Sequence, residues 1–176
     1  NPATCDGGGT ANAETNVTTS FTYDSIGNRI RVDAPDPAGG ATAITTRYAF
    51  DTANRLCRVL QNASPAGQTF TCSSAVTGST ATTNVVTTYG YDDLGNLTSA
   101  TDARGKVTSY AYDAAGRMTS VSDPLAATLR YRYDALGRRT SQENRSDPPL
   151  TQSVVWTYDA AGRVLTRTAN GVTVTS

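Results

Sequence analysis

Residues 108–123 read TSYAYDAAGRMTSVSD, and close copies of this stretch recur along the chain. The copies at residues 87–102, 129–144 and 154–169 read TTYGYDDLGNLTSATD, LRYRYDALGRRTSQEN and VVWTYDAAGRVLTRTA. A phrase that returns at short intervals indicates a repeat architecture, in which each copy forms one supersecondary unit. The local structure of the phrase therefore decides the fold.

Six copies of the phrase align on an aromatic residue followed by Asp, at intervals of 27, 41, 21, 21 and 25 residues. Three positions after each Asp stands Gly, or Asn in one copy, and both residues accept positive φ. An Asp-initiated type I turn closed by such a residue is typical of a β-hairpin with a G1 bulge. The predicted structural repeat residues are Tyr23, Asp24, Gly27, Phe50, Asp51, Asn54, Tyr91, Asp92, Gly95, Tyr112, Asp113, Gly116, Arg117, Tyr133, Asp134, Gly137, Arg138, Tyr158, Asp159, Gly162 and Arg163.

A second set of turns, also rich in Asp, separates these hairpins. Three of them begin at Asp102, Asp123 and Asp147, and a looser candidate spans Asp33-Ala-Pro-Asp36. Between the turns lie runs of six or seven residues rich in Thr, Val and Tyr, which is an ordinary strand length and composition. The sequence predicts an all-β fold of repeated antiparallel hairpins.

The predicted turn also sets the pairing across each hairpin. Asp113 should face Arg117, and Tyr112 should face Met118. In the copies where Arg follows at this second position, we expect Tyr23 and Tyr133 to make cation–π contacts with Arg29 and Arg139.

Side chains alternate along a strand, so the aromatic residues two positions before each Tyr share its face. This aromatic stripe should be covered by neighbouring strands, without a concave cluster of exposed rings beside polar groups. The rings used for this expectation are Tyr110, Tyr112, Tyr131 and Tyr133.

Two stretches interrupt the repeats and divide the chain into four segments. Residues 1–16 form a polar, Gly-rich linker or loop, and residues 17–56 hold repeats 1 and 2. Residues 57–84 form an insertion loop or extended hairpin, for which a recognition role is the alternative. Residues 85–176 hold repeats 3 to 6 and the start of the next strand.

The three cysteines allow two interpretations. A disulfide between Cys57 and Cys72 would close the base of the insertion and suit an exported protein, whereas free buried thiols are the alternative. The role of Cys5 stays open.

The composition argues against catalysis and against several partners. The chain has no His and a single Lys, so the common general bases are nearly absent, and we expect no enzyme and no catalytic residue. Equivalent Asp residues lie two strand spacings apart, roughly 10 Å, which is too far to share a metal ion; no metal or other cofactor is expected. The 15 basic and 15 acidic residues cancel, which disfavours nucleic acid and anionic membranes as partners. No apolar run approaches the roughly 20 residues of a membrane helix, so we expect no membrane insertion.

The stretches YDAAGRMTSVSD, YDALGRRTS and YDAAGRVLTRT resemble the RHS/YD-repeat family, which includes bacterial RHS toxins, wall-associated proteins and teneurins. The resemblance covers residues 17–171 and is strongest from Val85 onward. It implies that the hairpins join into one continuous, spiralling sheet, as an arc of a shell. The family's self-cleaving core region has no counterpart here.

The resemblance implies a non-catalytic structural segment that encloses or displays a C-terminal polymorphic toxin. The partners would be the rest of the same chain or further copies at the open sheet edges, and an enclosed toxin domain. A surface adhesion or glycan-binding module and a self-assembling extracellular scaffold remain the alternatives. An exported, extracellular or cell-surface location is implied, and because Asn1 is not Met and no signal peptide is present, we expect the export signal outside this segment.

Overall fold

The computed structural model describes residues 18–36, 43–64, 69–80, 82–125, 127–145 and 152–175, and residues 1–16, Cys5 included, lie outside it. The described residues form strands and turns without a helix. The strands are β1 (Ser20–Tyr23), β2 (Arg29–Ala34), β3 (Ile44–Phe50), β4 (Leu56–Gln61), β5 (Val85–Tyr91), β6 (Leu97–Thr101), β7 (Val107–Tyr112), β8 (Met118–Ser122), β9 (Thr128–Tyr133), β10 (Arg139–Arg145), β11 (Gln152–Tyr158), β12 (Val164–Ala169) and β13 (Val172–Thr175).

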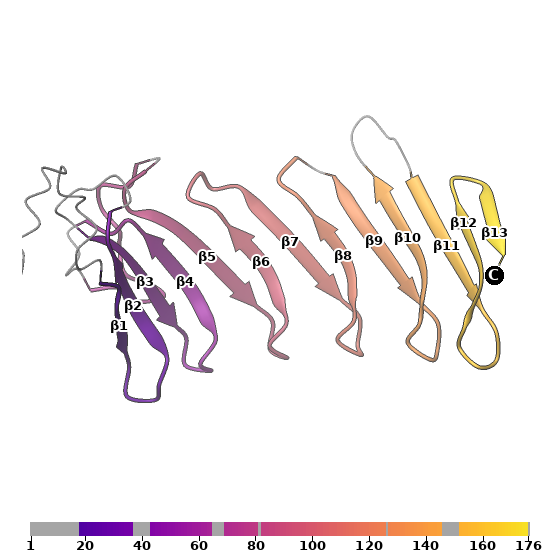
Figure 1. Ribbon diagram of the computed structural model, residues 1–176, viewed down its shortest axis with the longest axis horizontal. Coiled ribbons are helices and arrows are strands. Elements are labelled where there is room, and N and C mark those ends of the chain that lie inside the picture. The colour runs from indigo at the N-terminus through magenta and orange to yellow at the C-terminus, as the bar shows by residue number, and fades with distance from the viewer. Residues whose placement is uncertain are drawn as a thin grey trace, which may run out of the picture.

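The thirteen strands of the described residues belong to one antiparallel sheet in which the spatial order is the order along the chain. Figure 1 shows them side by side from indigo β1 to yellow β13, with β1 to β3 crowded at one end of the curving sheet. Within the described residues the sheet is open, since β1 and β13 each pair with a described strand on one side only. The prediction of an all-β fold made of joined hairpins is confirmed.

The predicted pairing across the hairpins is also confirmed. Tyr112 lies opposite Met118, and the backbone N–H of Asp113 donates to the carbonyl oxygen of Arg117 over 2.9 Å. The register then shifts, because Ala111 lies opposite Ser120 and Thr119 is an extra residue on β8. This second irregularity was not predicted. It recurs in every hairpin of the repeat, at Ile30, Cys57, Thr98, Thr140 and Leu165.

The second set of turns is confirmed at Asp102 and Asp123, whose backbone N–H groups donate to the carbonyl oxygens of Lys106 and Ala127. The turn predicted at Asp147 lies outside the described residues. The turn predicted to begin at Asp33 is wrong, because Asp33 lies within β2 and pairs with Ser20 on one side and with Thr45 on the other. The Asp33 carboxylate accepts from Arg31 and Thr45, so side-chain partners on the sheet replace the turn.

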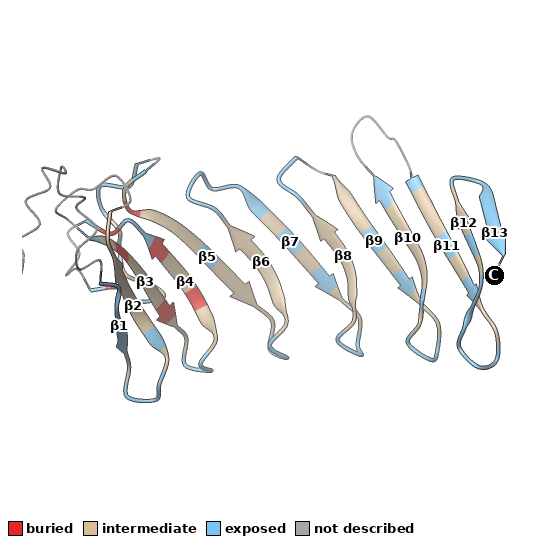
Figure 2. Cartoon of the chain, viewed as in Figure 1, coloured by how far each residue is buried: buried red, intermediate tan, exposed pale blue. Residues whose placement is uncertain are grey.

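Among the described residues, full burial is confined to β3, β4 and the segment that follows β4, as the red residues of Figure 2 show. Thr45 and Ala49 lie on the face of β3 opposite to Tyr48, and residues from the insertion cover that face. From β5 to β13, no described residue is buried. The buried apolar residues are Ala49, Cys57, Leu60, Ala63 and Phe70.

Candidate functional site: the tyrosine, aspartate and arginine residues of the repeats

Each turn Asp uses its whole carboxylate to hold the hairpin. In the fourth hairpin, Oδ1 of Asp113 accepts from the backbone N–H of Ala115 at 2.9 Å and of Arg117 at 3.0 Å. Its Oδ2 accepts from Nε of Arg117 at 2.7 Å. The backbone N–H of Gly116 donates to the Asp113 carbonyl oxygen, with Gly116 at a φ of 74°. The carboxylate is therefore committed to the turn.

The other five turns repeat this geometry with small changes. Asn54 takes the place of Gly with a φ of 62°, as the alignment predicted. Asn28 and Asn96 replace the Arg, and each donates its amide N–H to Oδ2 of its turn Asp at 2.9 Å. The turn Asp residues are Asp24, Asp51, Asp92, Asp134 and Asp159.

These hydrogen bonds favour the ionised carboxylates. The side-chain bond from Arg117, followed by its backbone N–H, holds the pKa of Asp113 below its ordinary value. For Asp159 the backbone N–H of Arg163 has the largest effect in lowering the pKa, and for Asp92 the amide of Asn96 does. The shifts have a structural cause in every case, so they do not by themselves indicate a catalytic acid or base.

The same Arg residues also connect one hairpin to the next, which the sequence analysis missed. Arg138 is paired with Asp134 at 2.7 Å, and its Nη1 donates to the carbonyl oxygen of Asp159 in the following hairpin at 3.2 Å. Its guanidinium lies over the ring of Tyr158, 4.6 Å from the centroid. The Tyr158 hydroxyl in turn donates to the carbonyl oxygen of Arg139 at 2.6 Å.

We call this set of contacts an arginine junction. Two further junctions contain the same contacts, and in both the guanidinium carbon lies 4.8 Å from the centroid of the Tyr ring. In each, the Arg donates to the carbonyl of the next turn Asp, and the next Tyr hydroxyl donates back to the preceding hairpin. They join Arg55 to Tyr91 and Arg117 to Tyr133.

Where Asn replaces Arg, the junction is smaller. Asn28 donates to Oδ1 of Asn54 in the next hairpin, and no cation lies over the ring of Phe50 in the described part of the chain. At Asn96 the following ring is Tyr112, whose pKa is raised by burial away from water. Among the described residues, Tyr112 has no cation over its ring either.

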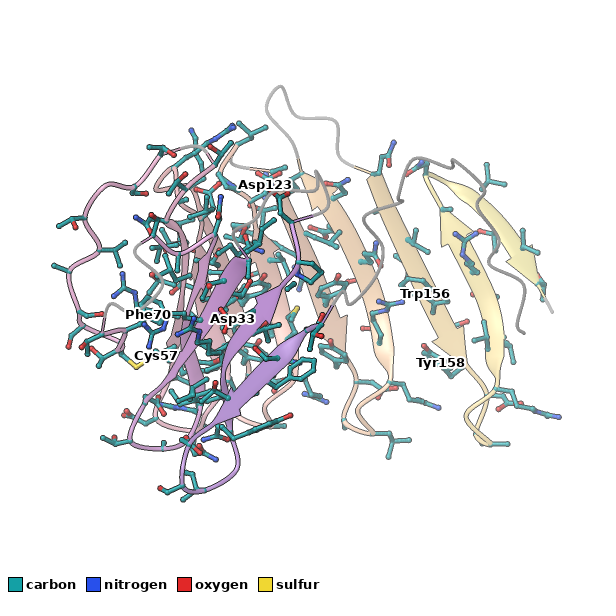
Figure 3. The ribbon with its side chains drawn as sticks, turned by 60° about the vertical axis from the view of Figure 1, so that its left-hand side comes forward. Asp33, Cys57, Phe70, Asp123, Trp156 and Tyr158 are labelled. Atoms are coloured by element: carbon teal, nitrogen blue, oxygen red, sulfur yellow. A yellow bond between two sulfur atoms is a disulfide. The ribbon has the colours of Figure 1, made fainter. Side chains whose placement is uncertain are left out.

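The predicted cation–π contacts of Arg29 with Tyr23 and of Arg139 with Tyr133 are not formed. Arg139 instead lies between the rings of Tyr131, at 5.5 Å, and Trp156, at 4.8 Å. The side chain of Arg139 thus contacts the aromatic residue of the next hairpin, Trp156, whose indole ring has a larger face than the ring of Tyr133. Figure 3 shows Trp156 and Tyr158 on β11, where these contacts are made.

Arg29 makes the equivalent contacts at the other end of the sheet. Its guanidinium lies 5.9 Å from the ring centroid of Phe21 and 5.1 Å from that of Tyr48. Unlike the Arg of each arginine junction, neither Arg29 nor Arg139 forms an ion pair with a described carboxylate.

The aromatic stripe is only partly covered. The four rings of Tyr110, Tyr112, Tyr131 and Tyr133 are half-buried between neighbouring strands. Between hairpins 1 and 2, away from these four rings, lies an open hollow of about 450 Å³. The hollow, which we call the aromatic hollow, is lined by Tyr23, Gly27, Asn28, Arg29, Tyr48, Phe50 and Leu56.

The insertion after β4 is tied to the sheet by a disulfide between Cys57 and Cys72, with their Cα atoms 5.6 Å apart. Phe70 packs beside Cys57, as Figure 3 shows, and the Arg58 guanidinium lies 5.3 Å from the Phe70 ring centroid. Asn84 is buried at the end of the insertion, where its side chain bonds the backbone of Ser64 in both directions. The insertion thus forms a cap on the face of the sheet opposite to the aromatic stripe.

Within the described ranges, no three His, Cys, Asp or Glu side chains come together as a metal site would require. No helix in the part of the chain that the structure describes is long and apolar enough to cross a membrane.

Comparison with known proteins identifies the repeat itself. Residues 75–105 and 91–128 match the family model named RHS Repeat. No curated protein matches the chain. A crystal structure of TcdB2-TccC3 is similar over 86% of this chain and 11% of its own, at 14% identity and a TM-score of 0.36. The structure of TcdB2-TccC3 without its hypervariable C-terminal region matches at 14% identity and a TM-score of 0.35, over 86% of this chain and 10% of its own. The chain therefore spans about a tenth of the length of these solved chains.

Proposed function

We propose that this chain of RHS repeats is a non-catalytic wall segment of a larger exported protein, in which the sheet encloses or displays a toxin domain. The observation that supports the proposal is the structural role of the Tyr, Asp and Arg side chains of the repeat. In the arginine junctions the charged and hydroxyl groups of Tyr, Asp and Arg are committed to holding one hairpin to the next. Groups committed in this way favour a wall over a reactive site.

A wall of this kind would act by containment. Each hairpin closes its backbone hydrogen bonds onto its neighbours, so cargo behind the sheet meets few free backbone groups and proteases meet few flexible segments. The open edges at β1 and β13 would pair with the rest of the same chain or with further copies, because an unpaired edge is a template for another strand. An extracellular or cell-surface location belongs to the same proposal.

The test is protease protection of the complete gene product. We expect a domain beside the repeats to resist digestion in the parent, and to be cleaved at least tenfold faster in the double variant Arg117→Ala/Arg138→Ala. Arg104→Ala, which changes an exposed turn side chain, is the matched control and should behave as the parent. Equal digestion of parent and double variant, or a gene product without any domain besides the sheet, would overturn containment.

A further inference from the structure

The tips of the six hairpin turns form a row along one edge of the sheet. Each tip residue is the second residue after the turn Asp. Because the strands are antiparallel and follow the order of the chain, all six tips lie on the same edge, the lower one in Figure 1. We call this row the turn rim. Its residues, from hairpin 1 to hairpin 6, are Ile26, Ala53, Leu94, Ala115, Leu136 and Ala161.

Large and small side chains alternate along the turn rim. Ile26, Leu94 and Leu136 stand on hairpins 1, 3 and 5, and they are 71%, 78% and 76% exposed. Hairpins 2, 4 and 6 carry an exposed Ala at the same position. Neighbouring strands lie about 4.8 Å apart, so a large apolar side chain recurs about every 19 Å, with an Ala midway. The rim is therefore a regular series of projections and gaps.

The backbone of each tip is already hydrogen-bonded within its own turn. The N–H of Leu94 donates to Oδ1 of Asp92 at 3.0 Å, and the N–H of Ala115 donates to Oδ1 of Asp113 at 2.9 Å. The other four tip N–H groups have the same partner in their turns. Removal of water from the rim leaves these donors satisfied, which favours burial of the tips against another apolar surface.

The alternation makes the rim complementary to a second copy of itself. A two-fold rotation about the normal to the sheet, between hairpins 3 and 4, places two rims edge to edge and reverses the order of the hairpins. Hairpin 3 then meets hairpin 4 of the other copy, hairpin 1 meets hairpin 6 and hairpin 5 meets hairpin 2, so every large side chain meets an Ala. The same rotation preserves the direction in which the sheet curves, so the two rims match along their length.

We propose that the turn rim is a dimer interface, in which a second copy of this chain packs rim to rim about this two-fold axis. At its centre, Leu94 of each copy packs beside Ala115 of the other. The contact is made by side chains at the turn tips, and so differs from the backbone pairing proposed for the edges at β1 and β13. A lipid surface fits the rim less well, because it has no gaps to match the alternation.

Sedimentation velocity at increasing protein concentration measures the equilibrium between monomer and dimer. Leu94→Ala removes a projection and Ala115→Leu fills a gap, so each change alone should raise the Kd of the dimer about tenfold. The double variant Leu94→Ala/Ala115→Leu exchanges the two sizes and should restore most of the affinity. Leu125→Ala is the matched control, because Leu125 is 79% exposed in a turn at the opposite edge of the sheet, and it should leave the Kd unchanged.

Both single variants should fold as the parent does, because Leu and Ala already occupy this turn position in other hairpins. A protein that stays monomeric at every concentration overturns the proposal, and binding of that monomer to phosphatidylcholine vesicles would assign the rim to a lipid surface instead. A dimer that Ala115→Leu leaves unchanged would place the association elsewhere, as at the edge strands, and also overturns it. So does a double variant that associates no better than the single ones.

Discussion

Strands β3 to β5 and strands β6 to β13 belong to one sheet but are stabilised differently. Around β3 and β4 the insertion covers one face, and side chains such as Leu60 and Phe70 are removed from water. From β6 onward, no described residue is buried, and the hairpins are connected by backbone pairing and, between hairpins 4 and 5 and hairpins 5 and 6, by arginine junctions. Two physical mechanisms therefore operate within one continuous structure.

The difference shows what each mechanism requires of the chain. A packed core needs side chains from segments distant in the sequence, such as Ala49 and Phe70, to fit together. A junction needs only one hairpin and the next. We expect the capped region to unfold as a cooperative unit, and the rest to behave as a row of units coupled to their nearest neighbours.

The largest loss of stability should come from a mutation in the buried cluster between the sheet and the insertion. Leu60 has no exposed surface, so Leu60→Ala should lower the free energy of unfolding by about 2 to 5 kcal/mol, through lost burial and the cavity left behind. Chemical denaturation measures the change. Leu129→Ala on β9, a half-buried position, is the matched control and should cost less than half as much. Equal losses would remove the distinction between the two regions.

The disulfide should act on the same region. Cys57 and Cys72 close a loop with a sequence separation of 15 residues, which corresponds to about 3 kcal/mol in the chain-entropy treatment. Reduction should raise hydrogen exchange in β3 to β5 while leaving β9 to β12 unchanged. A native mass that does not rise by about 2 Da on reduction would show that the bond is absent.

In strands β6 to β13, which the insertion does not cover, mutations in the arginine junctions should cause the largest losses of stability. Arg138→Gln removes an ion pair, a cation–π contact and a hydrogen bond to the next hairpin, and should cost about 1 to 2 kcal/mol. A double-mutant cycle with Tyr158→Leu measures the coupling, since both changes act on one junction. Additive effects would mean that the two side chains act independently. Arg163→Gln is the control: its side chain is 82% exposed and it contacts no following hairpin in the described residues, so the loss should be smaller.

Substitution of a turn glycine should lower the free energy of unfolding by a similar or slightly smaller amount. Gly116 has a φ of 74° and an added Cβ would meet only ordinary contacts, so the cost of Gly116→Val reflects the backbone alone, about 1 to 2 kcal/mol. Gly116→Asn should be milder, because Asn54 adopts a φ of 62° at the equivalent position. Equal melting temperatures of the Val and Asn variants would contradict the assigned turn.

The smallest effect for each residue should be the dependence on pH. The turn carboxyls have a lower pKa in the folded protein than in the unfolded chain, as for Asp113 and Asp159. Their contribution is therefore present above the unfolded pKa of about 4 and is lost as the pH falls through the lowered, folded value. Hydrogen exchange of β7 to β12 should increase in this acid range before that of β3 and β4 does. The reverse order would indicate that the carboxylates matter little to the junctions.

The local structure could be predicted from the sequence because it is encoded within a few residues. The Asp-x-x-Gly turn, the pairing of Tyr112 with Met118 and the use of Asn54 at positive φ each depend on one short stretch. The wrong turn at Asp33 has the same origin, since a local Asp-Ala-Pro signal was outweighed by pairing with two neighbouring strands.

What could not be predicted depends on contacts between hairpins. Arg138 was assigned to Asp134, which is correct, but its contacts with Tyr158 and Asp159 need the spatial position of the following unit. The extra residue at Thr119 and the packing of Phe70 against the sheet likewise arise from the assembled structure. Asn28, which stands where other hairpins have Arg, marks the aromatic hollow in the sequence. The substitution could not be interpreted from the sequence, because the contacts of the Arg with the next hairpin were not known.

The reciprocal arginine junction has a consequence for how the gene can change. Hairpin 5 carries both halves of the joint, because its Tyr133 hydroxyl donates back to hairpin 4 and its Arg138 donates forward to hairpin 6. Duplication or deletion of one 21-residue unit in the DNA would therefore create or remove a hairpin whose two joints are already complementary to its neighbours. The length of such a sheet can vary between descendants without a new core having to evolve, whereas the disulfide-tied cap must be inherited whole.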